Sequence, residues 1–296
     1  MLTFEITHQD HCRRLESYLR TLMPTSPFGY ARKLVKSGAV KHNGALATPD
    51  TLLALHDRVT LKESAGTTGY ITSNRPDLDI LYEDGSIVIV NKPAGLPMHR
   101  TAECEDNLVG VGQAYMMGRD TSCKLYPVNR LDRGTSGTVI LAKSSSAAGV
   151  YGRQVKETGL DKLYLALVWG TADNSGVINE PLDEKESETR YEILQPGDNC
   201  SLLAVTPISG RMHQIRRHLA AIGHPVVGDK RYGGSDMPEL SGFALHSFRT
   251  ALVREEAGPL TVCAPLPEEL LALCTRRGIE LDQLQEAVYS LVEEAL

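Results

Sequence analysis

Several common sequence features are missing from this chain. None of its apolar runs approaches the about 20 residues that a helix needs to cross a bilayer. Residues 1–6 lack the basic start and apolar centre of a secretory signal. The six cysteines form no Cys-x-x-Cys pair and no Cys-His cluster at metal-ligand spacing, and no glycine-rich phosphate cradle is present. We therefore expect a cytoplasmic protein with reduced thiols, no structural metal, no cofactor and no membrane contact.

Charge is distributed unevenly along the chain. The net charge of −6 argues against a general polyanion binder. Residues 1–64, however, carry nine basic and six acidic side chains, and residues 200–233 carry five basic side chains and one acidic, Asp229. Residues 264–296 carry two basic and seven acidic side chains. Positive charge is thus concentrated in two stretches, as contacts to phosphate would require.

The chain is long enough for one substantial core and a small satellite domain. Residues 1–64 have the pattern of a small unit with helices near 12–22 and 30–36 and strands near 39–42 and 58–61. Residues 65–76 are rich in Gly, Ser and Thr and are expected to form a flexible linker. Residues 77–296 form the larger predicted domain and end in an acidic tail with helical periodicity.

The most informative segment is residues 129–139, which read Asn-Arg-Leu-Asp-Arg-Gly-Thr-Ser-Gly-Thr-Val. Residues 138–142 have the composition of a strand, and residues 134–137 have the composition of a turn. Asp132 is therefore expected on a loop held by a rigid sheet, where functional residues often lie. On spacing alone, an aspartate between two arginines is more often a surface ion pair.

A second dense segment covers residues 210–219 and reads Gly-Arg-Met-His-Gln-Ile-Arg-Arg-His-Leu. His213 and His218 are five residues apart, about 140° around a helix, so we do not expect them to share a metal. Arg216 and Arg217 point from different faces of the same helix. One of them is expected to point inward and the other to meet phosphate.

Residues 129–139 resemble the His-Arg-Leu-Asp-x-x-Thr-Ser-Gly signature of the RluA-type pseudouridine synthases, with Asn129 in place of the family's histidine. Residues 210–219 match that family's Gly-Arg-x-His-Gln-Ile-Arg-x-His-Leu pattern, and residues 162–166 match its Lys-x-Tyr-x-Ala pattern. Residues 92–99 match its Lys-Pro-x-Gly-x-x-x-His segment, which is expected to shape the floor of the site.

The resemblance implies an α+β fold with a mixed, largely antiparallel sheet, and an RNA pseudouridine synthase, which is an isomerase that modifies uridines in structured RNA. It implies that Asp132 is the nucleophile and that Arg216 pairs with it. Tyr164 would stack on the uracil and take part in proton transfer, and Arg130 would fill the gap left by the flipped base. Further phosphate contacts are expected at Arg217, Lys230 and Arg231.

The N-terminal unit resembles the ribosomal-protein-type RNA-binding module called the S-four domain. Arg14-Leu15, the basic pair Arg32-Lys33 and the Asn-Gly turn at residues 43–44 carry this resemblance. It implies RNA contacts at Arg32 and Lys33, and it favours ribosomal over transfer RNA as the substrate. A generic small αβ domain is the alternative. The resemblance covers neither the acidic tail nor the oligomeric state, for which we expect a monomer.

Two other classes of protein fit the sequence less well. Enzymes that form an aspartyl-phosphate need a second carboxylate two residues after the first, and that position is Gly134. An RNA-binding protein without catalysis would suit the basic stretches, but it has no need of Asp132, Tyr164 and Arg216 together.

Overall fold

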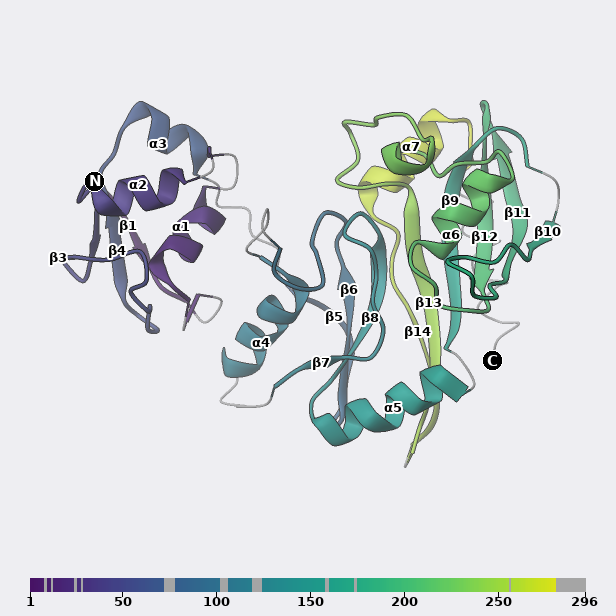
Figure 1. Ribbon diagram of the computed structural model, residues 1–296, viewed down its shortest axis with the longest axis horizontal. Coiled ribbons are helices and arrows are strands. Elements are labelled where there is room, and N and C mark those ends of the chain that lie inside the picture. The colour runs from purple at the N-terminus through teal and green to yellow at the C-terminus, as the bar shows by residue number, and fades with distance from the viewer. Residues whose placement is uncertain are drawn as a thin grey trace. The chain divides into compact units, whose positions relative to one another are not determined.

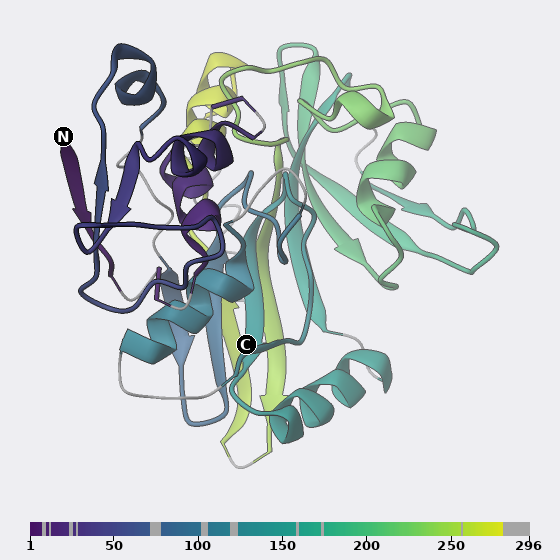
Figure 2. The same cartoon turned by 60° about the vertical axis from the view of Figure 1, so that its left-hand side comes forward.

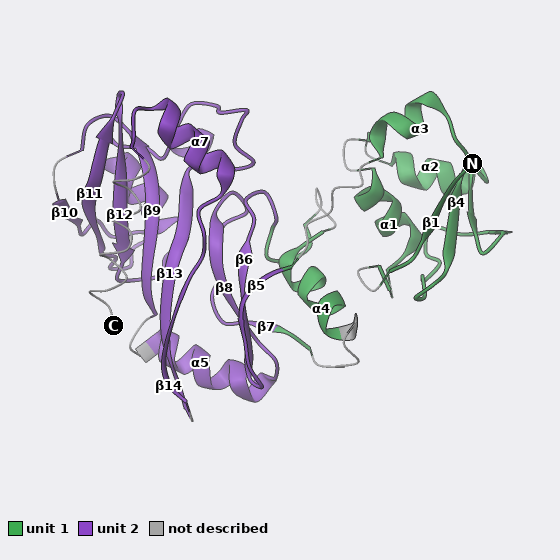
Figure 3. Ribbon diagram, turned by 180° about the vertical axis from the view of Figure 1, so that it is seen from behind, with its two compact units in different colours: residues 1–78, 97–125 green, residues 79–96, 126–296 purple. Residues whose placement is uncertain are grey.

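The computed structural model describes residues 1–7, 10–11, 13–23, 26–27, 29–71, 78–101, 106–118, 124–157, 160–172, 175–255 and 257–280. The chain divides into two units, which Figure 3 colours separately. Unit 1 combines residues 1–78 and 97–125, and unit 2 combines residues 79–96 and 126–296. The division places residues 97–125 with the N-terminal residues, whereas the sequence pattern assigned them to the larger domain. Within these described ranges, no helix is both long and apolar enough to span a membrane.

Unit 1 contains a four-stranded sheet in the order β1-β4-β2-β3. Apolar side chains of α1 and α2 pack on it, with Leu15, Leu19 and Val35 buried against Val59 and Leu61. The two predicted helices and two predicted strands are therefore present. The elements are β1 (Leu2–Glu5), α1 (Leu15–Leu22), α2 (Tyr30–Lys36), β2 (Val40–His42), β3 (Ala45–Leu46), β4 (Arg58–Leu61), α3 (Ala65–Tyr70) and α4 (Leu108–Gly118).

The turn between β2 and β3 is the hairpin that the Asn-Gly pair predicts. Asn43 and Gly44 both have positive φ, 50° and 83°, which the tight two-residue turn demands. Asp57 stabilises this turn. Its carboxylate accepts hydrogen bonds from the Ala54 amide (2.7 Å), Asn43 Nδ2 (2.7 Å) and His42 Nε2 (2.6 Å). These three donors lower the pKa of Asp57 to about 2.

The prediction of a flexible linker is wrong for residues 65–70, which form α3. Ser64 caps this helix, because its hydroxyl accepts a hydrogen bond from the Thr67 amide at 3.1 Å. Tyr70 packs edge-on against Tyr30, with the ring centroids 5.4 Å apart. Composition alone did not reveal a helix that depends on a cap and on a tertiary contact. Residues 72–77 of the predicted linker lie outside the described residues.

Unit 2 is built on a ten-stranded sheet whose main path runs β10-β11-β12-β9-β13-β8-β6-β5, with β14 paired to β13 and β7 to β8 (Figure 1). The strands are β5 (Asp79–Glu83), β6 (Ile87–Lys92), β7 (Tyr126–Pro127), β8 (Ser136–Ala142), β9 (Asp161–Trp169), β10 (Ser175–Ile178), β11 (Thr189–Gly197), β12 (Cys200–Pro207), β13 (Leu245–Arg254) and β14 (Gly258–Cys263). The helices are α5 (Ser145–Glu157), α6 (Gln214–Ala221) and α7 (Glu268–Arg276), with a short 3-10 helix η1 (Lys230–Tyr232).

β8 lies in the middle of this sheet and all seven of its residues are buried. It pairs antiparallel with β6 and parallel with β13, where His246 faces Ser136. β13 in turn pairs antiparallel with β9. The other pairings recorded for this sheet are antiparallel, which confirms the predicted mixed, largely antiparallel sheet. The order places the start of β8, just after Asp132, two strands away from Tyr164 on β9.

Helices lie at both ends of the strands of this sheet (Figures 1 and 2). α5 is at the end where β13 and β14 meet, and α7 is at the opposite end. Tyr151 and Val155 of α5 pack on Ile89 and Ile140 of the sheet. The strand predicted at residues 138–142 is present as part of β8. Helix α7 forms the first part of the acidic tail. Residues 281–296 lie outside the described residues.

Candidate active site

Asp132 lies on the loop between β7 and β8, as predicted. The side-chain amide of Asn129 fixes this loop, because its Oδ1 accepts from the Ile140 amide (2.8 Å) and its Nδ2 donates to the Thr138 carbonyl (3.3 Å). Asn129 thus bonds the backbone of β8 at two points, and its presence in place of histidine leaves the loop anchored. The side chain of Asp132 remains 25% exposed.

The glycines of the motif allow the loop and the start of β8 to pack closely against β13 and the residues just before it. A Cβ atom on Gly134 would stand 2.5 Å from the Phe243 ring, and one on Gly137 would stand 2.2 Å from the Ser247 carbonyl oxygen. Gly137 also has a φ of +112°, which disfavours any other residue. Ser136 and Gly137 belong to β8, so the predicted turn at residues 134–137 is shorter than expected.

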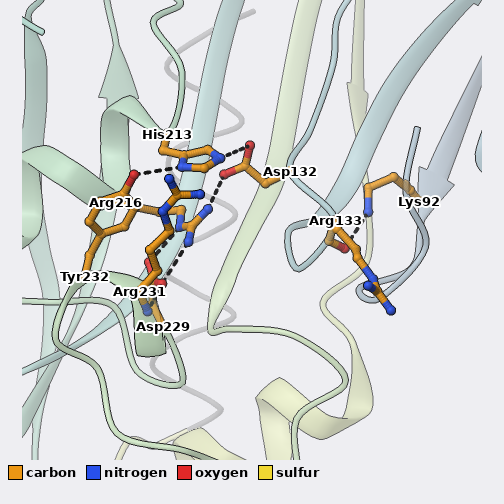
Figure 4. A network of polar contacts seen from close by, with 8 residues as sticks. All are labelled: Lys92, Asp132, Arg133, His213, Arg216, Asp229, Arg231 and Tyr232. Carbon is orange, nitrogen blue, oxygen red and sulfur yellow. Dashed lines mark hydrogen bonds and ion pairs between the residues drawn. The ribbon is translucent and has the colours of Figure 1, made fainter. Parts of the chain in front are cut away.

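The last residue of β6 and the segment that follows it contact the backbone of the loop that carries Asp132. Lys92 is completely buried, and its Nζ donates to the carbonyl oxygens of Pro93 (2.9 Å), Leu96 (2.9 Å) and Arg133 (3.2 Å). The Gly95 amide donates to the same Arg133 carbonyl at 2.8 Å. Burial lowers the pKa of Lys92 to about 7, although the charge of Asp132 opposes the shift. Figure 4 shows Lys92 reaching the residue next to Asp132.

Arg216 on α6 connects two carboxylates (Figure 4). Its Nη1 donates to Asp132 Oδ2 at 2.7 Å, while Nε and Nη2 donate to Asp229 Oδ2 (2.6 Å) and Oδ1 (2.8 Å). The guanidinium carbon also lies 5.0 Å from the Tyr232 ring centre and 4.2 Å from that of Phe243. The structure thus brings Asp132 and Arg216, 84 residues apart in sequence, into direct contact.

Asp229 and the two aromatic rings hold Arg216 in one orientation. The Arg216 side chain is 7% exposed and that of Asp229 is 2% exposed. Burial acts against the cation, but the hydrogen bonds that Arg216 donates to Asp229 and Asp132 outweigh it and raise the pKa of Arg216. Sequence reasoning did not assign a role to Asp229. One signal was available, because it is the only acidic residue in the basic stretch 200–233.

Tyr164 projects from β9 and is 7% exposed. Burial raises the pKa of Tyr164 to about 12, a side-chain hydrogen bond with Ser247 counteracts this in part, and the negative charge of Asp132 adds to the rise. The Ser247 hydroxyl lies 3.0 Å from that of Thr138, and the latter lies 2.5 Å from that of Thr250. Tyr164 is therefore a neutral phenol at neutral pH, at the end of a chain of buried hydroxyl groups.

A cavity of about 340 Å³ unites these side chains. Its wall includes Arg130, Asp132, Lys162, Tyr164, His213 and Arg216. A volume of this size suits a small ligand or a single extruded base. A larger cavity of about 540 Å³, lined by residues that include Asp161, Arg190 and Arg249, contains none of the predicted site residues.

The other predicted RNA contacts have varied surroundings. Arg130 is exposed at the cavity. Arg217 binds both oxygens of Asp183 (2.9 and 3.2 Å), and Lys230 pairs with Asp236 at 2.5 Å. The Arg231 guanidinium lies 5.6 Å from the Tyr232 ring centre. In unit 1, Arg32 pairs with Glu16 at 2.8 Å, and Lys33 is exposed on α2.

The two histidines of the second motif have separate environments. His218 is buried, and its ring nitrogens contact Thr189 Oγ1 (2.8 Å) and the Glu180 carbonyl (2.9 Å). His213 instead faces Asp132 and Tyr232 (Figure 4). Across the part of the chain that the structure describes, no three His, Cys, Asp or Glu side chains gather as metal ligands would.

Comparison with known proteins agrees with the fold. Residues 86–221 match the family model described as RNA pseudouridylate synthase. An uncharacterized RNA pseudouridine synthase of Synechocystis sp. is 31% identical over 89% of this chain and 90% of its own length. Ribosomal large subunit pseudouridine synthase C of Pasteurella multocida is 30% identical over 91% of both chains. Among solved structures, human RNA pseudouridylate synthase domain containing 1 superposes with a TM-score of 0.55 at 26% identity, covering 74% of this chain and 98% of its own.

The fold and the motifs define a pseudouridine synthase. The chain belongs to the RNA pseudouridylate synthase family, whose members isomerise uridine in RNA to pseudouridine.

Proposed function

We propose that Asp132 supplies the carboxylate that acts on the target uridine, that Arg216 keeps it ionised and oriented, and that Tyr164 stacks on the uracil. The observation that carries this proposal is the 2.7 Å hydrogen bond from Arg216 to Asp132, at the wall of a cavity that Tyr164 also lines. A guanidinium this close favours the anion by Coulomb attraction and restricts its orientation.

The reaction keeps every atom of the nucleotide. The bond between C1′ and N1 breaks, the base turns within the cavity, and a bond forms between C1′ and C5. The proton on C5 leaves and N1 gains one. The Asp132 anion begins this sequence by attack on C6 or C1′, or by assisting formation of a glycal. Burial raises the pKa of Tyr164 to about 12, so its phenol is protonated at neutral pH. The phenol can therefore help to remove the C5 proton only if it passes its own proton to a neighbouring group. Ser247 is hydrogen-bonded to Tyr164 and is such a neighbour.

A uridine stacked in a helix must leave the stack to reach this cavity, at a cost of a few kcal/mol. Arg130 lies at the cavity wall, two residues before Asp132, and is exposed. In our proposal its long side chain occupies the gap left by the flipped base. Arg32, Lys33, Arg217, Lys230 and Arg231 then contact phosphates of the surrounding RNA.

We propose ribosomal RNA of the large subunit as the substrate, because relatives that match this chain over about nine-tenths of its length carry that substrate in their names. Transfer RNA is the other candidate. A map of pseudouridines in ribosomal and transfer RNA from cells lacking the protein decides between them, since one or more positions must lose the modification. The cytoplasmic location and the monomeric state stay predictions.

Substitution Asp132→Asn tests the proposal. We expect this variant to keep its thermal unfolding temperature and its affinity for RNA but to release no tritium from RNA labelled at uracil C5, because a neutral amide is not a nucleophile. Tritium release at the wild-type rate would overturn the assignment of Asp132. The alternative of an RNA-binding protein without catalysis requires that the wild-type chain release no tritium from any cellular RNA fraction.

A further inference from the structure

The two oxygens of the Asp132 carboxylate have different surroundings (Figure 4). Oδ2 accepts the hydrogen bond from Arg216 at 2.7 Å. Oδ1 faces Nε2 of His213 at 3.7 Å, which is too long for a hydrogen bond but close enough for electrostatic attraction. In enzymes without bound substrate, catalytic hydrogen bonds are often long and shorten when the substrate binds. In this structure, Oδ1 is thus the carboxylate oxygen without a short hydrogen bond from Arg216 or His213.

The backbone and a tyrosine hold His213 in this place. His213 precedes α6 with φ 54° and ψ 28°, a left-handed conformation that is uncommon for a residue with a side chain. Its Nδ1 lies 2.9 Å from the Tyr232 hydroxyl, and the two rings meet edge to face at 5.7 Å. A strained backbone that is kept at a site of this kind is a reason to look for a function.

The carboxylate selects the tautomer of the imidazole. If Nδ1 carried the proton, the lone pair on Nε2 would face the Asp132 anion, which is repulsive. If the Tyr232 hydroxyl donates to Nδ1, the proton sits on Nε2 and points at Oδ1, which is attractive. The second arrangement is thus the stable one, and Tyr232 is the group that maintains it.

The charges around His213 favour the neutral ring. Burial lowers the pKa of His213, and the Asp132 charge opposes that shift. The cations of Arg216 and Arg231 lower it further, while Asp229 acts in the opposite direction. A charged imidazolium beside Asp132, in addition to Arg216, would stabilise the carboxylate anion further and weaken it as a nucleophile. A neutral donor orients the anion at a smaller loss of reactivity.

We infer that His213 is a positioning residue for Asp132, whose neutral Nε2–H, maintained by Tyr232, directs Oδ1 toward the flipped nucleotide while Arg216 holds Oδ2. The inference rests on the proposed role of Asp132. It assigns Oδ1 as the reacting oxygen. It also explains why the residue before α6 is a histidine, where asparagine or glycine would adopt the left-handed backbone more easily.

Two substitutions of His213 separate this role from a purely structural one. His213→Asn suits the left-handed backbone, but its amide is too short to reach Asp132. His213→Gln suits that backbone less well, but its amide nitrogen reaches the place of Nε2. We expect His213→Asn to lose about 10- to 100-fold in kcat at saturating RNA with KM unchanged, and His213→Gln to lose less. The measurement is single-turnover tritium release from C5-labelled RNA. If asparagine were the better replacement, or if only KM changed, the inference would be wrong.

Tyr232→Phe gives an independent test that does not alter the backbone of His213. We expect a loss of about three- to tenfold in kcat, and no additional loss when Tyr232→Phe is combined with His213→Asn, because both act through the same hydrogen bond. In ¹⁵N spectra of labelled imidazole, His213 should show a protonated Nε2 in the wild type and a mixture of tautomers in Tyr232→Phe. An Nδ1-protonated wild-type ring, or additive losses, would contradict the inference.

Asp132→Asn, assayed in parallel, tells the two ideas apart. If that variant retains activity, the proposed role of Asp132 fails. If it is inactive while His213→Asn and Tyr232→Phe equal the wild type, only the role of His213 fails.

Discussion

Asp57 of unit 1 and Asp132 of unit 2 both accept short hydrogen bonds, and they differ in which of their carboxylate oxygens are occupied. In unit 1, both oxygens of Asp57 accept hydrogen bonds, from Asn43, His42 and the Ala54 amide. In unit 2, Asp132 accepts one from Arg216 through Oδ2, while the nearest recorded partner of Oδ1 is 3.7 Å away. The first carboxylate stabilises a turn. The second belongs to a residue that lines a cavity, as the role proposed for Asp132 requires.

The support of Asp132 is therefore the feature whose loss should have the largest effect. Asp229→Asn removes one of the two charges that hold Arg216, so we expect the guanidinium to turn and kcat to fall about 100-fold. Single-turnover tritium release measures this effect. Asp236→Asn is the matched control, since Asp236 is an exposed carboxylate of the same region with an ion pair to Lys230. Equal activity of the two variants would show that Asp229 does not position Arg216.

Substitution of Arg130 tests whether a flipped base enters the cavity beside Asp132. We expect Arg130→Ala to lose about tenfold or more in turnover on folded RNA and about twofold on RNA in which the target uridine is unpaired, because unpairing removes part of the cost of flipping. The same release assay on two matched RNAs measures this ratio. Equal losses on both RNAs would argue against the gap-filling role. Arg153→Ala, an exposed cation on α5, serves as the control.

Unit 1 should contribute to affinity and not to chemistry. We expect Arg32→Ala with Lys33→Ala to raise the Kd for RNA several-fold and to reduce the salt dependence of log Kd by about one unit of slope per lost phosphate contact. The rate at saturating RNA should stay unchanged. Filter binding across a range of salt concentrations checks the first part. A Kd equal to that of the wild type would remove these two residues from the RNA surface.

The two units should also respond to acid over different ranges. Burial lowers the pKa of His246 in unit 2 from 6.5 to about 4. The unfolded state then binds a proton first, so unit 2 loses stability as pH falls from 6.5 to about 4. The pKa of Asp57 falls from 3.8 to about 2, so unit 1 loses that contribution only below about pH 4. The single tryptophan, Trp169, lies in unit 2, so its fluorescence reports that unit during acid titration.

The Asp57→Asn variant provides the control for this titration. We expect this variant to change how the circular dichroism signal falls below pH 4. The pH midpoint of the Trp169 fluorescence transition should stay unchanged. A change in the Trp169 transition would contradict the assignment of Asp57 to unit 1 alone.

Local pattern was sufficient for much of the fold. The apolar run of β8 was readable because backbone period and burial act over a few residues. The Asn-Gly pair was enough to predict the turn before β3. The helix α3 was missed because a capping serine and a contact between Tyr70 and Tyr30 stabilise it. Residues 97–125 were assigned to the larger domain because their grouping with unit 1 depends on tertiary contacts.

The sequence by itself determined which side chains are proposed to carry the chemistry, because the motif around Asp132, the strand with Tyr164 and the helix with Arg216 resemble patterns of a known family. Only the tertiary structure decided how these groups are held. The clamp of Asp229 and Phe243 on Arg216, the hydroxyl chain behind Tyr164 and the approach of His213 to Oδ1 join segments far apart in sequence. Such contacts form because the strand order of the sheet brings β8, β13 and β9 together, and no local pattern encodes that order.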